Sequence, residues 1–373
     1  MGHEVSFYAI GTPGQDQAVI DNFKKTYGVS ATTFMPSLKD IGAWLRFVIT
    51  HDWAYADRAS YVFGQLVHDS AFIAHVELFK PEAIIHFCSY SWPVAQFARS
   101  RNIPTVFRSH NYEPSFFWEE LDARAKLHPL NWVRYFAKRR GEWNAVRFTS
   151  AVASIPFGDL WRYRAWKGGN IFPLTLTYLP ESIHPPRVST EKKPLDVFYL
   201  GASYRVSFHL RGAAMLIEDI APRVMAQAPG MFRFHICGAK LPQYLVDKCD
   251  GKNVVYEGYV PDLEKFLEGM DIGAFPVFTG KVMKGKVFES LARGFPIVIP
   301  RVCMAEYALT HEKEVLLAES AEEFSTAIVT LADVEERNKL SRAAHDFVQR
   351  HFSKEALISS LEKPLNEALS QKS

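Results

Sequence analysis

Two lysines and a glutamate near position 286 have the side-chain types and the spacing to hold a phosphate and a sugar hydroxyl. Lys284, Lys286 and Glu289 lie where a loop becomes a predicted helix, and the last two, three residues apart, share one helix face. Ammonium groups beside the free N–H groups of a helix start attract phosphate. A carboxylate one turn later would accept hydrogen bonds from a ribose diol. A solvated helix edge with surface lysines is the alternative interpretation.

The segments on either side of this loop indicate a sheet that would position it. A short apolar run ends at Pro276, VFESLAR is typical of a helix that ends at Gly294, and PIVIP is typical of another strand. This order predicts a strand, a loop, a helix and a second strand. The loop would then lie at the carboxyl end of a strand, where open α/β sheets bind ligands.

The same stretch resembles the donor-binding signature of the GT-B glycosyltransferases, family 4 in particular (glycosyl transferases group 1). The matching positions are Pro276, Gly280, Lys284, Lys286, Glu289, Ala292, Gly294, Pro296 and Val298. The resemblance implies that Glu289 binds the nucleotide ribose. It also places Met283, Lys284 and Lys286 in the donor site, with basic side chains toward the diphosphate. Many members have a further glutamate where this chain has Lys281, so the identity of the sugar stays open.

The residues before this signature carry further parts of the resemblance. Gly201 ends a predicted strand, and a residue without a side chain there would let the backbone approach the diphosphate closely. Arg205 and Arg211 are candidates for neutralising its charge, and Arg205 is preferred because it lies in the loop. In the family, the backbone after a later glycine meets the nucleotide base, which implies that Tyr259 and Val260 contact it.

A histidine, an amide and a carboxylate follow another predicted strand, PTVF. His110, Asn111 and Glu113 belong to the segment RSHNYE, which resembles the H-N-x-E form found in many GT-B enzymes. His110 would position a hydroxyl or transfer its proton, because the ordinary pKa of histidine is near neutrality. Asn111 would act through hydrogen bonds, and Glu113 is the nearest candidate base. A loop histidine bonded to the backbone is the alternative.

Length and composition predict two α/β domains. The chain has 373 residues, of which 48% are hydrophobic and 23% charged, and its net charge of +2 argues against bulk nucleic-acid binding. The segment 178–194 is rich in proline and charge and predicts a boundary. We expect Rossmann-like doubly wound domains facing a cleft: an acceptor-side domain at 1–185, a donor domain at 186–352, and a helix at 353–373 that packs back toward the first.

The amino-terminal segment MGHEVSFYAIG resembles the second strand of a GT-B amino-terminal domain rather than the first. The first strand lies in the middle of a doubly wound sheet, so its loss would leave a neighbouring strand without partners on one side. We therefore expect the natural product to begin some tens of residues upstream. The alternative is that the sheet starts here.

Other features concern location and metals. The four cysteines have no metal-ligand spacing, no segment has the length of a membrane span, and no export signal is evident, which together favour a cytoplasmic protein. The chain has no Asp-x-Asp pattern for a divalent metal, so we expect metal-independent turnover without a cofactor. The segment WVRYFAKRRGEWNAVRF mixes aromatic and basic residues, which suits either contact with the inner membrane leaflet or an ordinary amphipathic helix.

The resemblance thus implies a glycosyltransferase of hexosyltransferase type. Its partners would be a nucleoside-diphosphate sugar and a glycan or lipid-linked acceptor, and the setting would be surface polysaccharide synthesis. Two other classes stay open, namely a nucleotide-sugar epimerase of GT-B fold and a non-catalytic two-lobed sugar-nucleotide binding protein. Fold resemblance by itself does not assign a reaction.

Overall fold

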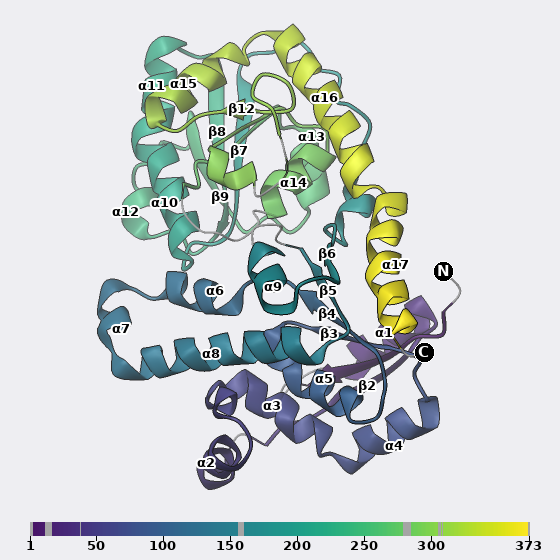
Figure 1. Ribbon diagram of the computed structural model, residues 1–373. Helices are drawn as coiled ribbons and strands as arrows, with labels where there is room; N and C mark the ends of the chain where they lie inside the picture. The colour runs from purple at the N-terminus through teal and green to yellow at the C-terminus, as the bar shows by residue number, and fades with distance from the viewer. Residues whose placement is uncertain are drawn as a thin grey trace. The chain divides into compact units, whose positions relative to one another are not determined.

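The computed structural model describes residues 3–11, 17–37, 39–155, 160–278, 285–304, 307 and 309–371, which form two compact units (Figure 1). The first unit comprises the described residues of Met1–Ser154, Asp159–Pro173 and Ser360–Ser373. The second comprises those of Ile155–Gly158 and Leu174–Ser359.

The strands of the first unit are all parallel. β1 (Ser6–Ile10) pairs with β2 (Ser30–Phe34), and a second sheet has the order β3 (Ile84–Phe87), β4 (Thr105–Ser109), β5 (Ala151–Ser154), β6 (Ile171–Pro173). The helices of this unit are α1 (Gln17–Tyr27), α2 (Ile41–Thr50), η1 (Trp53–Ala56), α3 (Arg58–Val67), α4 (Ser70–Phe79), η2 (Ser89–Ser91), α5 (Trp92–Arg99), α6 (Glu113–Glu120), α7 (Ala123–Leu127), α8 (Pro129–Phe148) and α9 (Leu160–Lys167).

Local sequence explains where three of these helices begin. Asp40 accepts a hydrogen bond from the Ala43 N–H at 2.9 Å and caps α2, and Asp69 does the same for α4. Asp57 caps α3. An aspartate in this position satisfies one of the N–H groups that lack a partner inside the helix. The apolar faces of α3, α4 and α5 then pack together in a core that includes Leu66, Phe72, Val76 and Phe97.

The second unit has one parallel sheet. Its strand order is β12 (Leu316–Leu317), β11 (Ile297–Ile299), β10 (Ile272–Ala274), β7 (Leu195–Ser203), β8 (Phe232–Ala239), β9 (Val254–Gly258). The helices are η4 (Leu179–Ser182), α10 (Ser207–Met215), the π-helical turn η5 (Leu216–Ile220), α11 (Ala221–Gln227), α12 (Gln243–Val246), α13 (Leu263–Glu268), α14 (Gly285–Ala292), η6 (Arg301–Met304), α15 (Ala321–Thr330), α16 (Val334–Phe352) and α17 (Lys354–Ser370), of which the last extends into the first unit.

This order confirms the predicted doubly wound α/β fold. From β7 the chain adds β8 and β9 on one side of the sheet, then returns to add β10, β11 and β12 on the other. The sheet therefore has a switch point between β7 and β10, and open sheets of this kind bind ligands outside the carboxyl ends of the strands at that point. The predicted helix with Lys286 and Glu289 is α14, which ends before Gly294, a residue with a φ of +76°.

A charged cluster links three strands of this sheet. His235 on β8 lies between two carboxylates, with its Nε2 2.9 Å from Asp196 Oδ1 on β7 and its Nδ1 2.7 Å from Glu257 Oε1 on β9. Burial opposes the charged ring, but the hydrogen bonds and charges of both carboxylates outweigh it and raise the pKa of His235. The folded protein therefore favours the protonated histidine more than the unfolded chain does.

We expect His235→Gln to lower the free energy of unfolding most at low pH. Because the folded pKa is raised, this stabilisation is fully present below the ordinary histidine value of about pH 6.5 and is lost as pH rises through the folded pKa. Urea unfolding of the protein and the variant across a pH series measures the difference. A difference that stays constant with pH would contradict the assignment of charge to His235.

Candidate functional site

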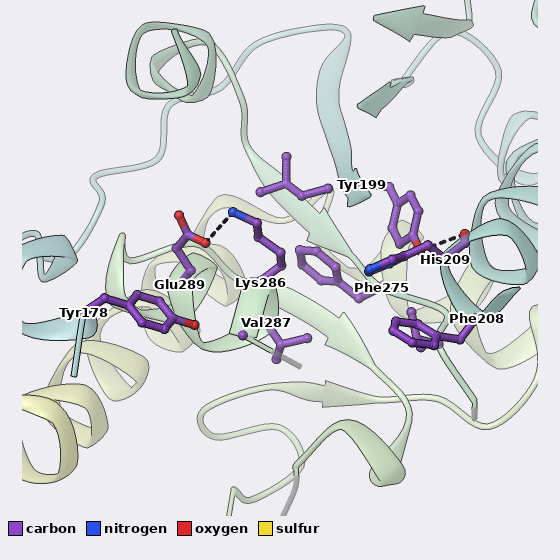
Figure 2. A pocket seen from close by; sticks show the side chains of 11 residues that line it. Tyr178, Tyr199, Phe208, His209, Phe275, Lys286, Val287 and Glu289 are labelled. Carbon is purple, nitrogen blue, oxygen red and sulfur yellow. Dashed lines mark hydrogen bonds and ion pairs between the residues drawn. The ribbon is translucent and has the colours of Figure 1, made fainter. Parts of the chain in front are cut away.

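A cavity of about 380 Å³ opens in the second unit at the switch point of the sheet (Figure 2). It is bounded by β7, by the segment after β10, by α10 and by the first turn of α14. The residues that line it are Tyr178, Tyr199, Leu200, Phe208, His209, Phe275, Val277, Gly285, Lys286, Val287 and Glu289. Apolar and aromatic walls with a few polar groups are typical of a small-molecule site.

Lys286 and Glu289 provide the charges of this cavity. Figure 2 shows the two side chains pointing toward one another, and Lys286 Nζ lies 2.8 Å from Glu289 Oε2. The other oxygen, Glu289 Oε1, lies 3.1 Å from Arg293 Nη1. Lys286 is the more exposed partner, with 40% of its side chain accessible against 13% for Glu289. The cavity therefore contains an accessible cation and a carboxylate that is already held in place.

The other donor-site candidates lie in different surroundings. Gly201 is on β7, where an added Cβ would lie 2.8 Å from the ring of Tyr204, so the buried tyrosine already requires glycine there. Arg205 and Arg211 are exposed and do not line the cavity, and neither does Tyr259, which is 74% exposed just after β9, nor Val260 beside it. Their contacts with a donor stay a prediction.

Two predicted residues and two signature positions fall outside the described part of the chain. Met283, Lys284, Gly280 and Lys281 belong to the segment 279–284 between β10 and α14. Gly285, which follows this segment directly, lines the cavity.

Tyr178 is a cavity residue that the motifs did not indicate. Its ring approaches the first turn of α14 so closely that an added Cβ at Gly285 would overlap with the tyrosine hydroxyl. Burial, together with the negative charge of Glu289, raises the pKa of Tyr178 to about 12, so the hydroxyl keeps its proton and can donate a hydrogen bond. Tyr178 lies in the proline-rich segment 178–194, whose sequence has no period that would indicate this contact.

In the first unit, His110, Asn111 and Glu113 follow the carboxyl end of β4. Burial of part of the imidazole and the positive charge of Arg108 both lower the pKa of His110, although its ring reaches solvent. Burial also raises the pKa of Glu113, and Asp57 adds to this effect while Lys138 opposes it. A histidine that is neutral near pH 7 can accept a proton, and so can the ionised form of Glu113.

A buried carboxylate from α8 fixes this loop. Glu142 has no exposed surface, and its Oε2 accepts a hydrogen bond from the Glu113 N–H at 3.3 Å. Its Oε1 accepts one from the Tyr163 hydroxyl at 2.6 Å, and that hydroxyl lies 2.7 Å from Ser109 Oγ. Ser109 ends β4, so Glu142 joins the strand end to the start of α6 on either side of His110.

Cys88 marks the same edge of the sheet. It follows β3 with φ 61° and ψ 153°, a conformation that residues with a side chain rarely adopt, and its N–H bonds to the Arg108 carbonyl at 3.1 Å. Such backbone strain is concentrated at functional sites. Burial raises the pKa of its thiol, so it is protonated at neutral pH. Neither Cys88 nor Glu142 belongs to a recognisable sequence motif.

Among the described residues, no three His, Cys, Asp or Glu side chains group as metal ligands would. Among these residues, Lys286 and Glu289 line the cavity, and Arg293 pairs with Glu289.

Comparisons with known proteins agree with this architecture. Residues 195–333 match a family model described as glycosyl transferases group 1. No curated protein matches the sequence significantly. Solved structures that are similar over nearly the whole chain share only its fold, since their sequence identities are low.

One such structure is sucrose-phosphate synthase from Thermosynechococcus elongatus, with a TM-score of 0.67, 15% identity, and 99% of this chain and 100% of that chain covered. Another is HepE from Anabaena in complex with UDP and glucose, with a TM-score of 0.65, 12% identity, and 97% and 99% covered. A third is a UDP-forming α,α-trehalose-phosphate synthase from Burkholderia xenovorans, with a TM-score of 0.61, 11% identity, and 98% and 99% covered. With its doubly wound second unit and the family match over residues 195–333 of that unit, the chain has the GT-B fold that these structures share.

Proposed function

We propose that the protein transfers a hexosyl group from a nucleoside-diphosphate sugar to a glycan or lipid-linked acceptor. The observation that carries the proposal is the ion pair between Lys286 and Glu289 near the start of α14. This pair lines the cavity of the unit that matches the family model. Glu289 would accept hydrogen bonds from the ribose hydroxyls, and Lys286 would bind the diphosphate. The HepE structures hold UDP or UDP-glucose, so uridine nucleotides are the first donors to test.

The reaction breaks the bond between the anomeric carbon and the diphosphate oxygen, and forms a bond from that carbon to an acceptor oxygen. The leaving diphosphate takes the electron pair, and the acceptor hydroxyl loses its proton. Fixed positive groups near the diphosphate lower this barrier, and removing one such group typically costs about 3–4 kcal/mol. Lys286, together with Lys284 and Arg205, would supply that charge. In the first unit, His110 or Glu113 would receive the proton and Asn111 would orient the acceptor.

We propose that this turnover needs no divalent metal, because the lysines would supply the charge that a metal provides elsewhere. Activity should be unchanged in EDTA. Loss of activity in the chelator, with recovery on adding manganese, would contradict this part of the proposal.

A single experiment separates the proposed transfer from its alternatives. The protein is incubated with radiolabelled UDP-, GDP- or TDP-sugars, with and without a membrane lipid extract, and the label is followed. Transfer moves the label to the extract, whereas an epimerase changes the sugar without an acceptor, and a binding protein retains the donor unchanged. A thermal-shift series with the same nucleotides identifies the donor, since a true ligand raises apparent stability by mass action.

We also propose that the protein works in surface polysaccharide synthesis at the cytoplasmic face of the inner membrane. No helix in the described ranges is both long enough and apolar enough to cross a bilayer. Contact would instead use the first half of α8, where Trp132, Val133 and Phe136 are 45%, 50% and 41% exposed and share one face. Leu127 and Leu130 beside them are 81% and 60% exposed. Apolar side chains in such numbers are seldom left in water unless a surface covers them.

The charges of the same segment favour an anionic surface. Residues 123–141 contain lysines and arginines but no acidic residue. Lys138 and Arg140 pair with Asp57 and Asp52, whereas Arg134 and Arg139 are exposed. On α2, the apolar residues Ile41, Leu45 and Ile49 are 58%, 47% and 81% exposed at a spacing of one helix turn. Since α2 and α8 both contact η1, the second helix would extend the surface.

The variant Trp132→Ser, Phe136→Ser is expected to bind phosphatidylglycerol vesicles at least about tenfold more weakly, because burying one aromatic side chain contributes about 1.5–3 kcal/mol. Co-sedimentation measures this, and nucleotide binding should not change. Val188→Ser, which alters an 87% exposed apolar residue of the other unit, is the control. Equal co-sedimentation of the variant and the parent with vesicles would overturn the proposal. So would a parent protein that forms dimers through this face and does not bind vesicles.

A further inference from the structure

Glu289 has a second cationic partner besides Lys286, namely Arg293, and this partner is much more buried than Lys286. Arg293 follows α14 directly and is 7% exposed, so its guanidinium is nearly removed from water. A buried guanidinium is costly unless carboxylates surround it with hydrogen bonds. Arg293 follows the last helical residue of the signature, at a position where the motif specifies no residue type.

Two carboxylates from different helices hold Arg293. Its Nη1 lies 3.1 Å from Glu289 Oε1 and also donates to the Glu289 carbonyl at 3.3 Å. Its Nε donates to Glu264 Oε1 on α13 at 3.1 Å, and its Nη2 donates to the same oxygen. These bonds lower the pKa of Glu264, so its carboxyl group is ionised at neutral pH. Arg293 therefore bridges α13 and α14 and cannot follow a ligand.

Glu289 thus pairs with a buried cation, Arg293, and with a more exposed one, Lys286. Lys286 Nζ lies 2.8 Å from Glu289 Oε2, and 40% of the Lys286 side chain is accessible. A diphosphate entering the cavity would compete for Lys286, which can turn toward it on a flexible stem. Glu289 would then lose one of its two cations just when its Oε2 is needed for a ribose hydroxyl.

We propose that Arg293 is a positioning residue, which holds Glu289 Oε1 so that Oε2 stays aimed into the cavity when Lys286 transfers to the diphosphate. The inference rests on the proposed nucleotide-sugar site and assigns different roles to its two cations. Lys286 binds the diphosphate, whereas Arg293 affects only binding of the ribose diol, through Glu289. Replacing Lys286 and replacing Arg293 should therefore have different effects on the affinity for a nucleotide that lacks the diol.

The test compares UDP and GDP with their 2′,3′-dideoxy forms by titration calorimetry. Arg293→Gln is expected to weaken binding of the ribonucleotide about tenfold, the loss typical of a charge-assisted hydrogen bond, and to leave the dideoxy form unchanged. Lys286→Ala should weaken both forms. Glu264→Gln, which loosens Arg293 without removing it, should give a smaller loss for the ribonucleotide alone. Arg293→Lys, which retains charge but not the fork of donors, should fall between Arg293→Gln and the parent.

Each outcome decides between positioning and simple stability. Equal weakening of both nucleotide forms by Arg293→Gln would show a general structural role and overturn the inference, as would no weakening of either. If Arg293→Gln does not fold, Glu264→Gln gives the same comparison from an exposed position. A parent that binds neither UDP nor GDP would instead count against the proposed function, and a parent that binds both forms equally would show that no ribose contact exists for Arg293 to support.

Discussion

Replacing Glu289 by alanine is expected to weaken binding of the nucleoside-diphosphate sugar about a hundredfold, since hydrogen bonds to a charged group contribute about 1.5–3 kcal/mol each and a ribose diol can make two. The carboxylate is mostly buried and held by Lys286 and Arg293, so its loss cannot be replaced by a neighbour. Lys286→Ala should weaken binding of the donor about tenfold, because the diphosphate loses one exposed cationic partner. Calorimetry with the donor found by thermal shift measures both.

The controls for this experiment come from the same unit. Glu268→Ala removes an exposed carboxylate at the end of α13 and should leave donor binding unchanged. Glu289→Gln keeps the shape of the side chain and separates lost charge from lost packing. If the double variant Lys286→Ala, Glu289→Ala binds every candidate nucleotide as well as the parent does, the assignment of a donor site to this cavity fails.

Replacing His110 by alanine is expected to lower kcat by about a hundredfold to a thousandfold, the usual effect of losing a general acid or base, while donor binding is retained. The donor cavity lies in the other unit, so the two effects should separate. Turnover under saturating donor, beside calorimetric binding, gives both numbers. His68→Ala, an exposed histidine at the end of α3, is the matched control.

The pH dependence distinguishes His110 from Glu113 only when variants are compared. The pKa of His110 is lowered from 6.5 and that of Glu113 is raised from 4.5, so both shifts reduce the difference between the two ordinary pKa values. Either residue as the base gives an acidic limb of kcat/KM on which activity rises with pH, with its midpoint below pH 6.5 for His110 or above pH 4.5 for Glu113. The variant that removes this limb, His110→Asn or Glu113→Gln, identifies the base. A limb that survives both changes would mean that neither residue accepts the proton.

The parts of the site that follow a local pattern could be predicted from the sequence. A loop, a helix with Lys286 and Glu289 on one face, and Gly294 at its end depend on neighbouring residues only, and α14 has this form. The strands around it were predictable for the same reason. Tyr178 and Arg293 were not, because each joins the site through a contact with a different element that only the folded chain brings close.

The segment on α8 shows a different limit of prediction from sequence. Its aromatic and basic residues suited either a core-facing helix or a membrane contact. The folded helix buries small residues and a charged one, namely Ala137, Gly141 and Glu142, while Trp132 and Phe136 are exposed. A hydrophobic pattern assigns the inner face to the largest apolar residues, and it fails where a buried carboxylate has a structural task.

The strand order of the second unit has a consequence for synthesis on the ribosome. β7 gains its partner β8 early, but its other neighbour, β10, begins only at Ile272, 69 residues after β7 ends at Ser203. At about 5–20 residues per second, one edge of this central apolar strand stays open for roughly 3–14 seconds while the nascent chain grows. An open edge of that kind pairs readily with other chains, so the yield of native protein should depend on chaperones that cover it and on slow, cool expression.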